Sequence, residues 1–519
     1  MPEALDTKPI ADRPPERMTS ATRNRTSEAP VPTDRLLIRS IAWSAASDWG
    51  TQIFTWLAFL QVMRLLNPAD FGIAALANIL MPYMGQLTGL GFPRAVVALR
   101  DLTEDQLAQM NTLSLLSATS LFLLGAAIAR PFAVFFKTPA LAPVFIVACS
   151  GLILSALCGV PNAVLAKEMR FRFLSILGIA CTLTAAASTL ILAWLGFKYW
   201  SLLLGNMIAG VLRMVVILFV RPTRLAWPRP KSIRRPLRFG WQISVSLVAM
   251  NSYQRLDNFV AGRVLGPAAL GFYGNAWELA NVPIEKIASL VTTVIPSFLS
   301  AVQEQPAALR RYLRGLTEVI SMGTFPATVG LSLVAPEFVP VVFGHKWDGM
   351  VSALQVLLLY AGFRSIVALL PKVMTSIGRV RFVMLNELAA FVLLPIAFYV
   401  GSHRGIVGIA WAWVLAYPVI VLPLYRETLK TIGMNAGEYI RSLRPALTGT
   451  IGMVLAVAGL KHILARGQPV LLRLTEEVVV GVIVYMAVLW FCHKDRVLAL
   501  IQTVKHLWSR IPLPVEAGA

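Results

Sequence analysis

The sequence is poor in charged residues, and in acidic ones above all. Only 14% of its 519 residues are Asp, Glu, Lys or Arg, and 26 acidic residues stand against 47 basic ones, so the net charge is +21. Hydrophobic residues make up 57%, and the mean hydropathy is +0.68. A soluble domain could not keep so many apolar side chains off its surface. The composition therefore predicts a polytopic membrane protein.

Cysteines and long hydrophilic segments are also scarce. The cysteines lie inside or beside apolar runs without metal-ligand spacing, which favours a packing role over a disulfide or metal site for Cys149, Cys158, Cys181 and Cys492. The segments between the apolar runs are too short to fold as a soluble catalytic domain. The basic residues are spread over these short loops, so the positive charge does not indicate a nucleic-acid-binding face. We expect no enzyme activity and no cofactor.

Apolar segments follow one another along most of the chain. About fourteen of them have the roughly 18 to 27 residues needed to cross a hydrocarbon core of about 30 Å. Residues 1–37 lack an apolar run of signal-peptide length and are expected to form a disordered cytoplasmic tail. We expect the rest to comprise an N-lobe with spans one to six (38–220), a basic cytoplasmic linker (221–238), a C-lobe with spans seven to twelve (239–424), spans thirteen and fourteen (446–492) and a basic cytoplasmic tail (493–519).

Two stretches of the sequence occur twice. RLLNPADFGIA, which begins at Arg64, is repeated as RVLGPAALGFY, which begins at Arg263. Each copy separates two apolar segments, and its Pro suits the first turn of a helix, so each predicts a tight transmembrane hairpin. A weaker repeat relates PNAVLAKEMRFRF, from Pro161, to PKVMTSIGRVRF, from Pro371. The fold class predicted is all-α, with two six-helix lobes related by a pseudo-twofold axis along the membrane normal and two extra C-terminal helices.

The basic residues also predict the orientation in the membrane. If the N-terminus is cytoplasmic, the cytoplasmic segments hold most of the 47 Lys and Arg residues. They outnumber those of the external segments roughly threefold, as the positive-inside rule requires. Both termini are therefore expected in the cytoplasm.

Polar residues inside the spans are the candidates for function, because each is costly in lipid. Span eight places a run of them on one helix face: Asn275, Glu278, Asn281, Glu285, Lys286, Ser289, Thr292 and Thr293. Span one has a similar stripe that includes Asp48, and span seven has one with Asn251, Arg255 and Asn258. These stripes predict a water-accessible cavity between the halves. The alternative is that Ser and Thr mediate close helix packing and the charges pair locally.

Arg255 is the strongest single candidate for substrate binding. It shares a predicted face with Asn251 and Asn258, and an Arg can hold a phosphate through two parallel hydrogen bonds. The alternative is a buried ion pair with Glu278 or Asp48.

Other polar residues within the spans allow more than one interpretation. Arg94, after GLGFP, either meets an anionic headgroup at the inner mouth or merely flanks its span. Asp257 lies on a different helix face from Arg255, which favours a structural hydrogen-bonding role. No comparable polar stripe surrounds Arg213 or Arg364.

The motifs carry a family resemblance. RVLGPAALGFYGNAWELANVP, preceded by LDNFVAG, resembles the lipid-linked oligosaccharide flippases of the polysaccharide-transport branch of the MOP superfamily, as do VPNAVLAKEMRFRFLSI, RLLNPADFGIA and SIGRVRF. The similarity covers about residues 38 to 495. It implies an inner-membrane protein whose two lobes face each other in a V and move undecaprenyl-diphosphate-linked sugars to the outer leaflet by alternating access. The family's cationic cavity maps onto Arg255 and Lys286.

The acidic and basic residues of the predicted cavity are expected to have different roles toward this substrate. Asp48, Glu278 and Glu285 would repel a diphosphate, so they suit sugar hydroxyls or a coupling H⁺ or Na⁺. The expected partners are lipid-linked oligosaccharide and the bilayer, with polymerase and export machinery as candidates. A multidrug cation exporter shares the fold but should have a cavity dominated by carboxylates. A membrane glycan polymerase or ligase would normally carry a large external loop.

Overall fold

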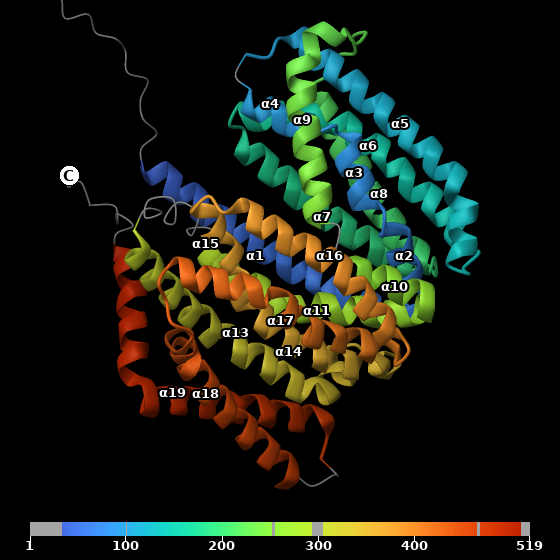
Figure 1. The fold of residues 1–519 in the computed structure, drawn as a ribbon. Coiled ribbons are helices and arrows are strands. Elements are labelled where there is room, and N and C mark those ends of the chain that lie inside the picture. The colour runs from blue at the N-terminus through green and yellow to red at the C-terminus, as the bar shows by residue number, and fades with distance from the viewer. Residues whose placement is uncertain (1–33, 100, 252–254, 293–304, 464–467, 510–519) are drawn as a thin grey trace, which may run out of the picture. The chain divides into compact units, whose positions relative to one another are not determined.

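The computed structural model describes residues 34–99, 101–251, 255–292, 305–463 and 468–509. The chain divides into a short unit, Met1–Ala45, and a main unit, Ala46–Ala519, to which the contacts below belong. All regular structure in the described residues is helical (Figure 1). The elements are α1 (Asp34–Leu65), α2 (Pro68–Asn78), α3 (Met81–Thr88), α4 (Phe92–Ala98), α5 (Glu104–Phe135), α6 (Leu141–Lys167), α7 (Phe171–Trp194), α8 (Tyr199–Val220), α9 (Pro230–Asn251), α10 (Leu256–Leu265), α11 (Pro267–Thr292), α13 (Pro306–Val342), η2 (His345–Met350), α14 (Val351–Val367), α15 (Leu369–Ser376), α16 (Val380–Ser402), α17 (Gly405–Thr431), α18 (Ala436–Ile463) and α19 (Val470–Ser509).

The length and composition of these helices confirm a membrane-spanning fold. Within the described ranges, 10 helices or helix runs are long and apolar enough to cross a membrane, and a bent pair raises this number to 11. The bent pair consists of Gly50–Leu65 and Pro68–Thr88, between which the helix direction bends by 117°. This bend lies at the first predicted hairpin. The predicted second span is not one helix but three short ones, α2, α3 and α4, and the break before α4 falls at Gly91, whose φ is +69°.

Spans seven and eight are the most polar of those predicted. Span seven is divided between α9 and α10, and α9 begins at Pro230, inside the segment predicted as a linker. Span eight corresponds to α11, which carries Glu278, Glu285 and Lys286. Neither span is among the apolar helices counted above: α10 has only 10 residues, and α11 carries charged and amide side chains that lower its hydropathy.

The two copies of the hairpin repeat pack against each other. Glycines at equivalent positions of the two copies let α2 and α11 touch: a Cβ at Gly72 would lie 1.7 Å from the carbonyl oxygen of Pro267, and one at Gly271 would lie 1.8 Å from that of Pro68. The equivalent Gly and Pro of each copy thus make the same contact with the other copy. A reciprocal contact of this kind is the property of a twofold axis, here relating two parts of one chain. It supports the predicted duplication and pseudo-twofold arrangement.

The second repeat forms the same turn in both halves. Met169, after α6, and Gly378, after α15, both have left-handed backbones with φ of +58° and +79°. The next residue in each turn donates its N–H to a carbonyl five residues earlier: Arg170 to Leu165 at 3.1 Å, and Arg379 to Met374 at 2.9 Å. This is the pattern by which a left-handed residue ends a helix. The second repeat therefore marks equivalent helix ends.

The last two helices, orange-red to red in Figure 1, pack on α13. A buried ionic cluster joins the three helices: Lys461 of α18 lies 2.8 Å from Glu337 of α13 and 3.2 Å from Glu477 of α19, and Arg473 lies 3.4 Å from Glu337. Helix α19 extends past the predicted span and is interrupted at His493, whose backbone is non-helical. The predicted domain boundaries otherwise remain predictions.

Candidate functional site

One face of α11 carries the charged residues of the candidate site. Glu278, Glu285 and Lys286 are exposed, whereas Tyr273 and Ala276 on the other side of the helix are fully buried. The buried side packs against α2 and α14. The helical spacing of the polar residues thus separates an accessible charged face from a packed apolar one, as the sequence predicts.

The charged face of α11 reaches α1. The Nζ of Lys286 donates to the Oε1 of Gln52 at 3.1 Å, which joins a helix of each predicted lobe. On α1, the hydroxyl of Thr55 instead donates to the carbonyl of Thr51 at 2.8 Å. The contact of α1 with α11 is therefore made by Gln52, whereas Thr55 bonds within its own helix.

Arg255 occupies the junction between α9 and α10. It is the residue before the first turn of α10 and has a non-helical backbone (φ −124°, ψ 7°), so Asn251 and Asn258 do not lie on one continuous helix with it. Its side chain is exposed and makes no direct hydrogen bond or ion pair with another described residue. It is nevertheless close enough to Glu278 and Asp257 for its charge to act on both. The guanidinium is thus available to a ligand beside the charged face of α11.

Asp257 belongs to a separate, fully buried cluster. Its carboxylate accepts hydrogen bonds from the Tyr273 hydroxyl at 2.8 Å, the Asn258 main-chain N–H at 2.7 Å and the Trp413 indole N–H at 3.3 Å. Three donors compensate for the burial of a carboxylate. The structural role predicted for Asp257 agrees with these bonds. The side-chain oxygen of Asn258 is also buried but has no partner among the described residues.

Arg94 lies where the broken second span meets α9. Its side chain is exposed in the first turn of α4. Beside it, a Cβ at Gly91 would lie 2.0 Å from the carbonyl oxygen of Gly240, so the two backbones touch. The structure therefore does not bring Arg94 into direct contact with the charges of α11. Asp48 and Asn251 are within α1 and α9, but their side chains lie outside the described residues.

Arg364 is a polar residue whose contacts could not be seen from the sequence. Its guanidinium on α14 donates to the Oδ1 of Asn281 on α11 at 2.9 Å and lies 5.7 Å from the centre of the Trp277 ring. Asn281 belongs to the polar stripe, so α14 contributes a positive charge to the same face. The only signal in the sequence was a lone Arg within an apolar segment.

Both hairpin Arg residues hold the other half of the chain at one end of the spans. Arg64 donates to the carbonyls of Val341 and Val342 at 2.9 and 3.1 Å, and Arg263 lies 4.8 Å from the ring centre of Phe135. Val341 and Val342 end α13, and Phe135 ends α5. Arg64 of the first half thus contacts the end of α13 in the second half, and Arg263 of the second half contacts the end of α5 in the first half.

A buried Trp makes further contacts at this end. The Trp347 indole N–H donates to the Met63 carbonyl at 2.8 Å, and its ring meets Phe71 at 5.2 Å and Phe272 at 6.0 Å. Phe71 belongs to the first hairpin copy and Phe272 to the second, although their positions do not correspond, since the counterpart of Phe71 is Leu270. Trp347 therefore packs against residues of both hairpin copies.

Residues 62–352 match the family model described as "Polysaccharide biosynthesis protein", which is more than half of the chain. The chain belongs to this family. The family resemblance expected from the motifs is therefore confirmed.

Relatives and a solved structure extend the match over most of the chain. The lipopolysaccharide biosynthesis protein WzxC of Escherichia coli is 23% identical over 78% of this chain and 84% of its own length. The succinoglycan biosynthesis transport protein ExoT of Rhizobium meliloti is 22% identical over 94% of this chain and 99% of its own length. The lipid II flippase MurJ, in an inward closed conformation, covers 88% of this chain and 100% of its own with a TM-score of 0.69 and 14% identity. At that identity, the likeness to MurJ shows that this polysaccharide biosynthesis protein shares the fold.

Proposed function

We propose that this protein moves a lipid-linked oligosaccharide with an undecaprenyl diphosphate from the cytoplasmic to the outer leaflet of the inner membrane. The observation that carries the proposal is the accessible charged face of α11, which bonds to α1 through Lys286 and Gln52 and lies beside Arg255, whose guanidinium pairs with no described residue. The names of WzxC, ExoT and MurJ, which concern lipopolysaccharide biosynthesis, succinoglycan transport and lipid II flipping, support the same function.

The mechanism follows from the different solubilities of the two parts of this substrate. A diphosphate and its sugars cannot cross hydrocarbon unaided, while a polyprenyl tail is stable there. The charged face of α11 supplies a polar path through the span, and the lipid tail remains in the bilayer. Arg255 and Lys286 attract the diphosphate, and Glu278 and Glu285 accept hydrogen bonds from sugar hydroxyls or take up a coupling H⁺ or Na⁺. The protein forms and breaks no covalent bond.

The direction of transport fits the closed hairpin end. In the proposed orientation both termini are cytoplasmic, so Arg64 and Arg263 lie on the external side, where their contacts keep the path closed. Substrate then enters from the cytoplasm, and release requires these contacts to break. A polymerase and export machinery would use the product on the outer side.

A multidrug cation exporter is the second candidate function, because it shares the fold of this superfamily. Basic groups at the site argue against it: Arg255, Lys286 and Arg364 all contribute positive charge to or beside the α11 face. These charges would repel a cationic drug and attract a diphosphate.

The test replaces Arg255. Arg255→Ala should abolish polymer export at wild-type membrane abundance, and Arg255→Lys should restore only part of it because an ammonium lacks the bidentate fork. The lost charge-assisted contact corresponds to on the order of 1.5 to 3 kcal/mol of binding free energy. Lipid-linked intermediates should accumulate in the Arg255→Ala strain, as measured by mass spectrometry of extracted lipids. Normal export by an abundant Arg255→Ala protein would remove this residue from the substrate site.

A further inference from the structure

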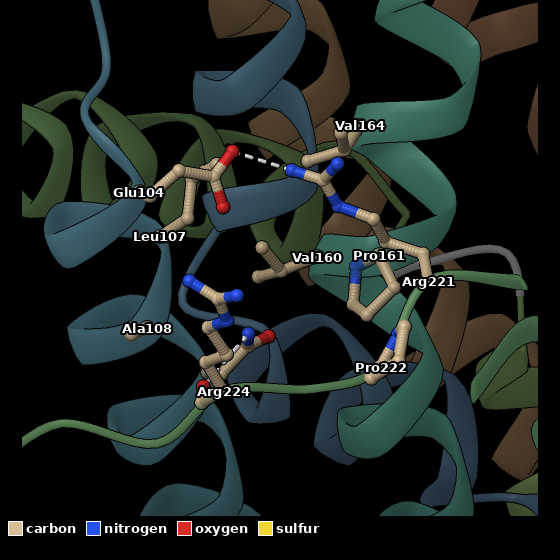
Figure 2. A pocket seen from close by; sticks show the side chains of 10 residues that line it. Glu104, Leu107, Ala108, Val160, Pro161, Val164, Arg221, Pro222 and Arg224 are labelled. Atoms are coloured by element: carbon tan, nitrogen blue, oxygen red, sulfur yellow. Dashed lines mark hydrogen bonds and ion pairs between the residues drawn. The ribbon is translucent and has the colours of Figure 1, made fainter. Parts of the chain in front are cut away.

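A cavity away from the α11 face lies where the segment after α8 crosses the ends of α5 and α6 (Figure 2). Its volume is about 340 Å³, at the lower end of the range for small-ligand sites. One side is apolar, with Leu107, Val160 and Val164. The polar side chains in its lining are those of Glu104, Asn111, Arg221 and Arg224.

The charges around the cavity leave one cation without a partner. Arg221 is 2.5 Å from Glu104 and 3.6 Å from Glu168, and Arg170 is 3.4 Å from Glu168. In Figure 2, Arg224 extends its guanidinium into the same space, and this guanidinium has no hydrogen bond or ion pair with a described residue. Three guanidinium groups therefore stand against two carboxylates. This excess of one positive charge fits a ligand group with a single negative charge.

Asn111 supplies a second requirement. The residue is only 7% exposed, its amide nitrogen donates to the Arg224 carbonyl at 3.3 Å, and its buried Oδ1 has no partner among the described residues. A buried acceptor without a donor is costly, and a ligand hydroxyl in the cavity would satisfy it. The complementary ligand therefore carries one negative charge and a neighbouring hydroxyl.

Exposed apolar side chains near the cavity indicate where this ligand comes from. Phe219, two residues before Arg221 in the sequence, is 89% exposed. Leu225 and Trp227, which follow Arg224, are 58% and 86% exposed. Exposed Trp and Phe at the end of a span are typical of the membrane interface. The cavity thus opens at the depth where phospholipid headgroups lie.

From these observations we infer that the cavity binds the phosphodiester headgroup of an anionic phospholipid that also bears a hydroxyl, as phosphatidylglycerol does. The phosphodiester carries the single negative charge that Arg224 attracts, and a glycerol hydroxyl donates to Asn111. The acyl chains extend past Phe219 and Trp227 into the bilayer. A soluble glycerophosphodiester has the same headgroup chemistry, so the experiment must distinguish the two sources.

The site would link the segment after α8 to the N-terminal half. That segment is already held to α5 by the Ala226 N–H, which donates to the Thr112 hydroxyl at 3.1 Å, and by the Arg229 N–H, which donates to the Gln109 side chain at 2.9 Å. A headgroup bound by Arg224 and Asn111 adds a further connection. Anionic lipid is therefore expected to stabilise the docked segment, whatever substrate the protein transports.

The test uses the purified full-length protein with phosphatidylglycerol or phosphatidylcholine, measured by native mass spectrometry and by the melting temperature. We expect wild type to bind phosphatidylglycerol preferentially and to melt at a higher temperature in its presence. Arg224→Ala should weaken this binding roughly ten- to a hundred-fold, which is the range for a lost charge-assisted contact, and Arg224→Lys should weaken it less. Arg235→Ala is the matched control, because Arg235 is an exposed Arg of the same basic segment that does not line the cavity.

Soluble glycerophosphoglycerol provides the second arm. If it competes with the lipid in wild type but not in Arg224→Ala, the headgroup chemistry is supported. If it binds with the same dependence on Arg224 while phosphatidylglycerol does not, a soluble phosphodiester is the ligand and the membrane source is wrong. Equal phosphatidylglycerol binding by wild type and Arg224→Ala, or an equal loss in Arg235→Ala, would overturn the site, and so would the failure of both probes to bind wild type. A wild-type melting temperature in the absence of lipid shows that each variant is folded.

Discussion

The contact between α2 and α11 allows a sharp test of the duplicated architecture through Gly271→Ala. The new Cβ would lie 1.8 Å from the Pro68 carbonyl oxygen and 3.2 Å from the Gly72 nitrogen. A carbon and a carbonyl oxygen do not normally approach closer than about 3.3 Å, so the helices must separate locally by about 1.5 Å. Both obstacles are main-chain atoms, which cannot rotate away as a flexible side chain would.

The expected cost follows from overpacking. Inserting a methyl group into a close contact costs about 1 to 3 kcal/mol, and we expect the upper end because α2 and α11 pack along much of their length. Gly274→Ala is the control on the same helix, since a Cβ there meets nothing within 4 Å. It should be neutral or stabilise the helix by up to about 1 kcal/mol.

The assay compares the thermal unfolding of the purified variants in one detergent. Gly271→Ala should melt below wild type and Gly274→Ala at or above it. Gly72→Ala should resemble Gly271→Ala, and the double variant should lose less than the sum because one separation of the helices relieves both clashes. A Gly271→Ala protein as stable as Gly274→Ala, or a fully additive double variant, would refute a reciprocal contact.

Three further predictions concern topology, the buried charges and the hairpin end. With both termini cytoplasmic, a cysteine at exposed Leu225 should be protected from an impermeant thiol reagent in intact cells, and one at exposed His403 should be labelled. Lys461→Met should lower stability by about 3 to 5 kcal/mol, because it leaves the two buried carboxylates of Glu337 and Glu477 without this cation. Trp347→Phe should cost about 1 kcal/mol, since it keeps most of the ring contacts but loses the indole hydrogen bond to α1, and both stability losses can be measured as denaturation midpoints.

Each of these predictions has a control. The labelling is done with the exposed native Cys492 replaced by Ser, and labelling of position 225 without position 403 would reverse the orientation. For the buried cluster, Lys430→Met removes an exposed cation outside it and should be nearly neutral. A Lys461→Met protein as stable as this control would show that the cluster is not a net requirement for folding. For the hairpin end, a stable Trp347→Phe protein would mean that water or another donor replaces the indole.

The sequence alone determined the class of the protein, the repeats and the family. Long apolar segments need only their own main-chain hydrogen bonds and lipid, so composition and length predict them without any tertiary contact. The copies at Arg64 and Arg263 predicted a duplication, and the amphipathic spacing of Glu278, Glu285 and Lys286 predicted the charged face of α11. Each of these inferences depends on residues close together in the chain.

The helix break at Arg255 and the contacts between helices were decided only by the tertiary structure, because they depend on residues far apart in the chain. The prediction of a shared polar face treated the segment around Arg255 as one continuous helix. The backbone of Arg255 is in fact non-helical, and α10 begins at the next residue. The hydrogen bond between Arg364 and Asn281 joins two helices, and the sequence of neither helix indicates that the other is its partner. The meeting of Gly72 with Pro267 likewise depends on how the two copies pack. Helix breaks and inter-helix contacts minimise the free energy of the whole assembly, so no local window of sequence contains them.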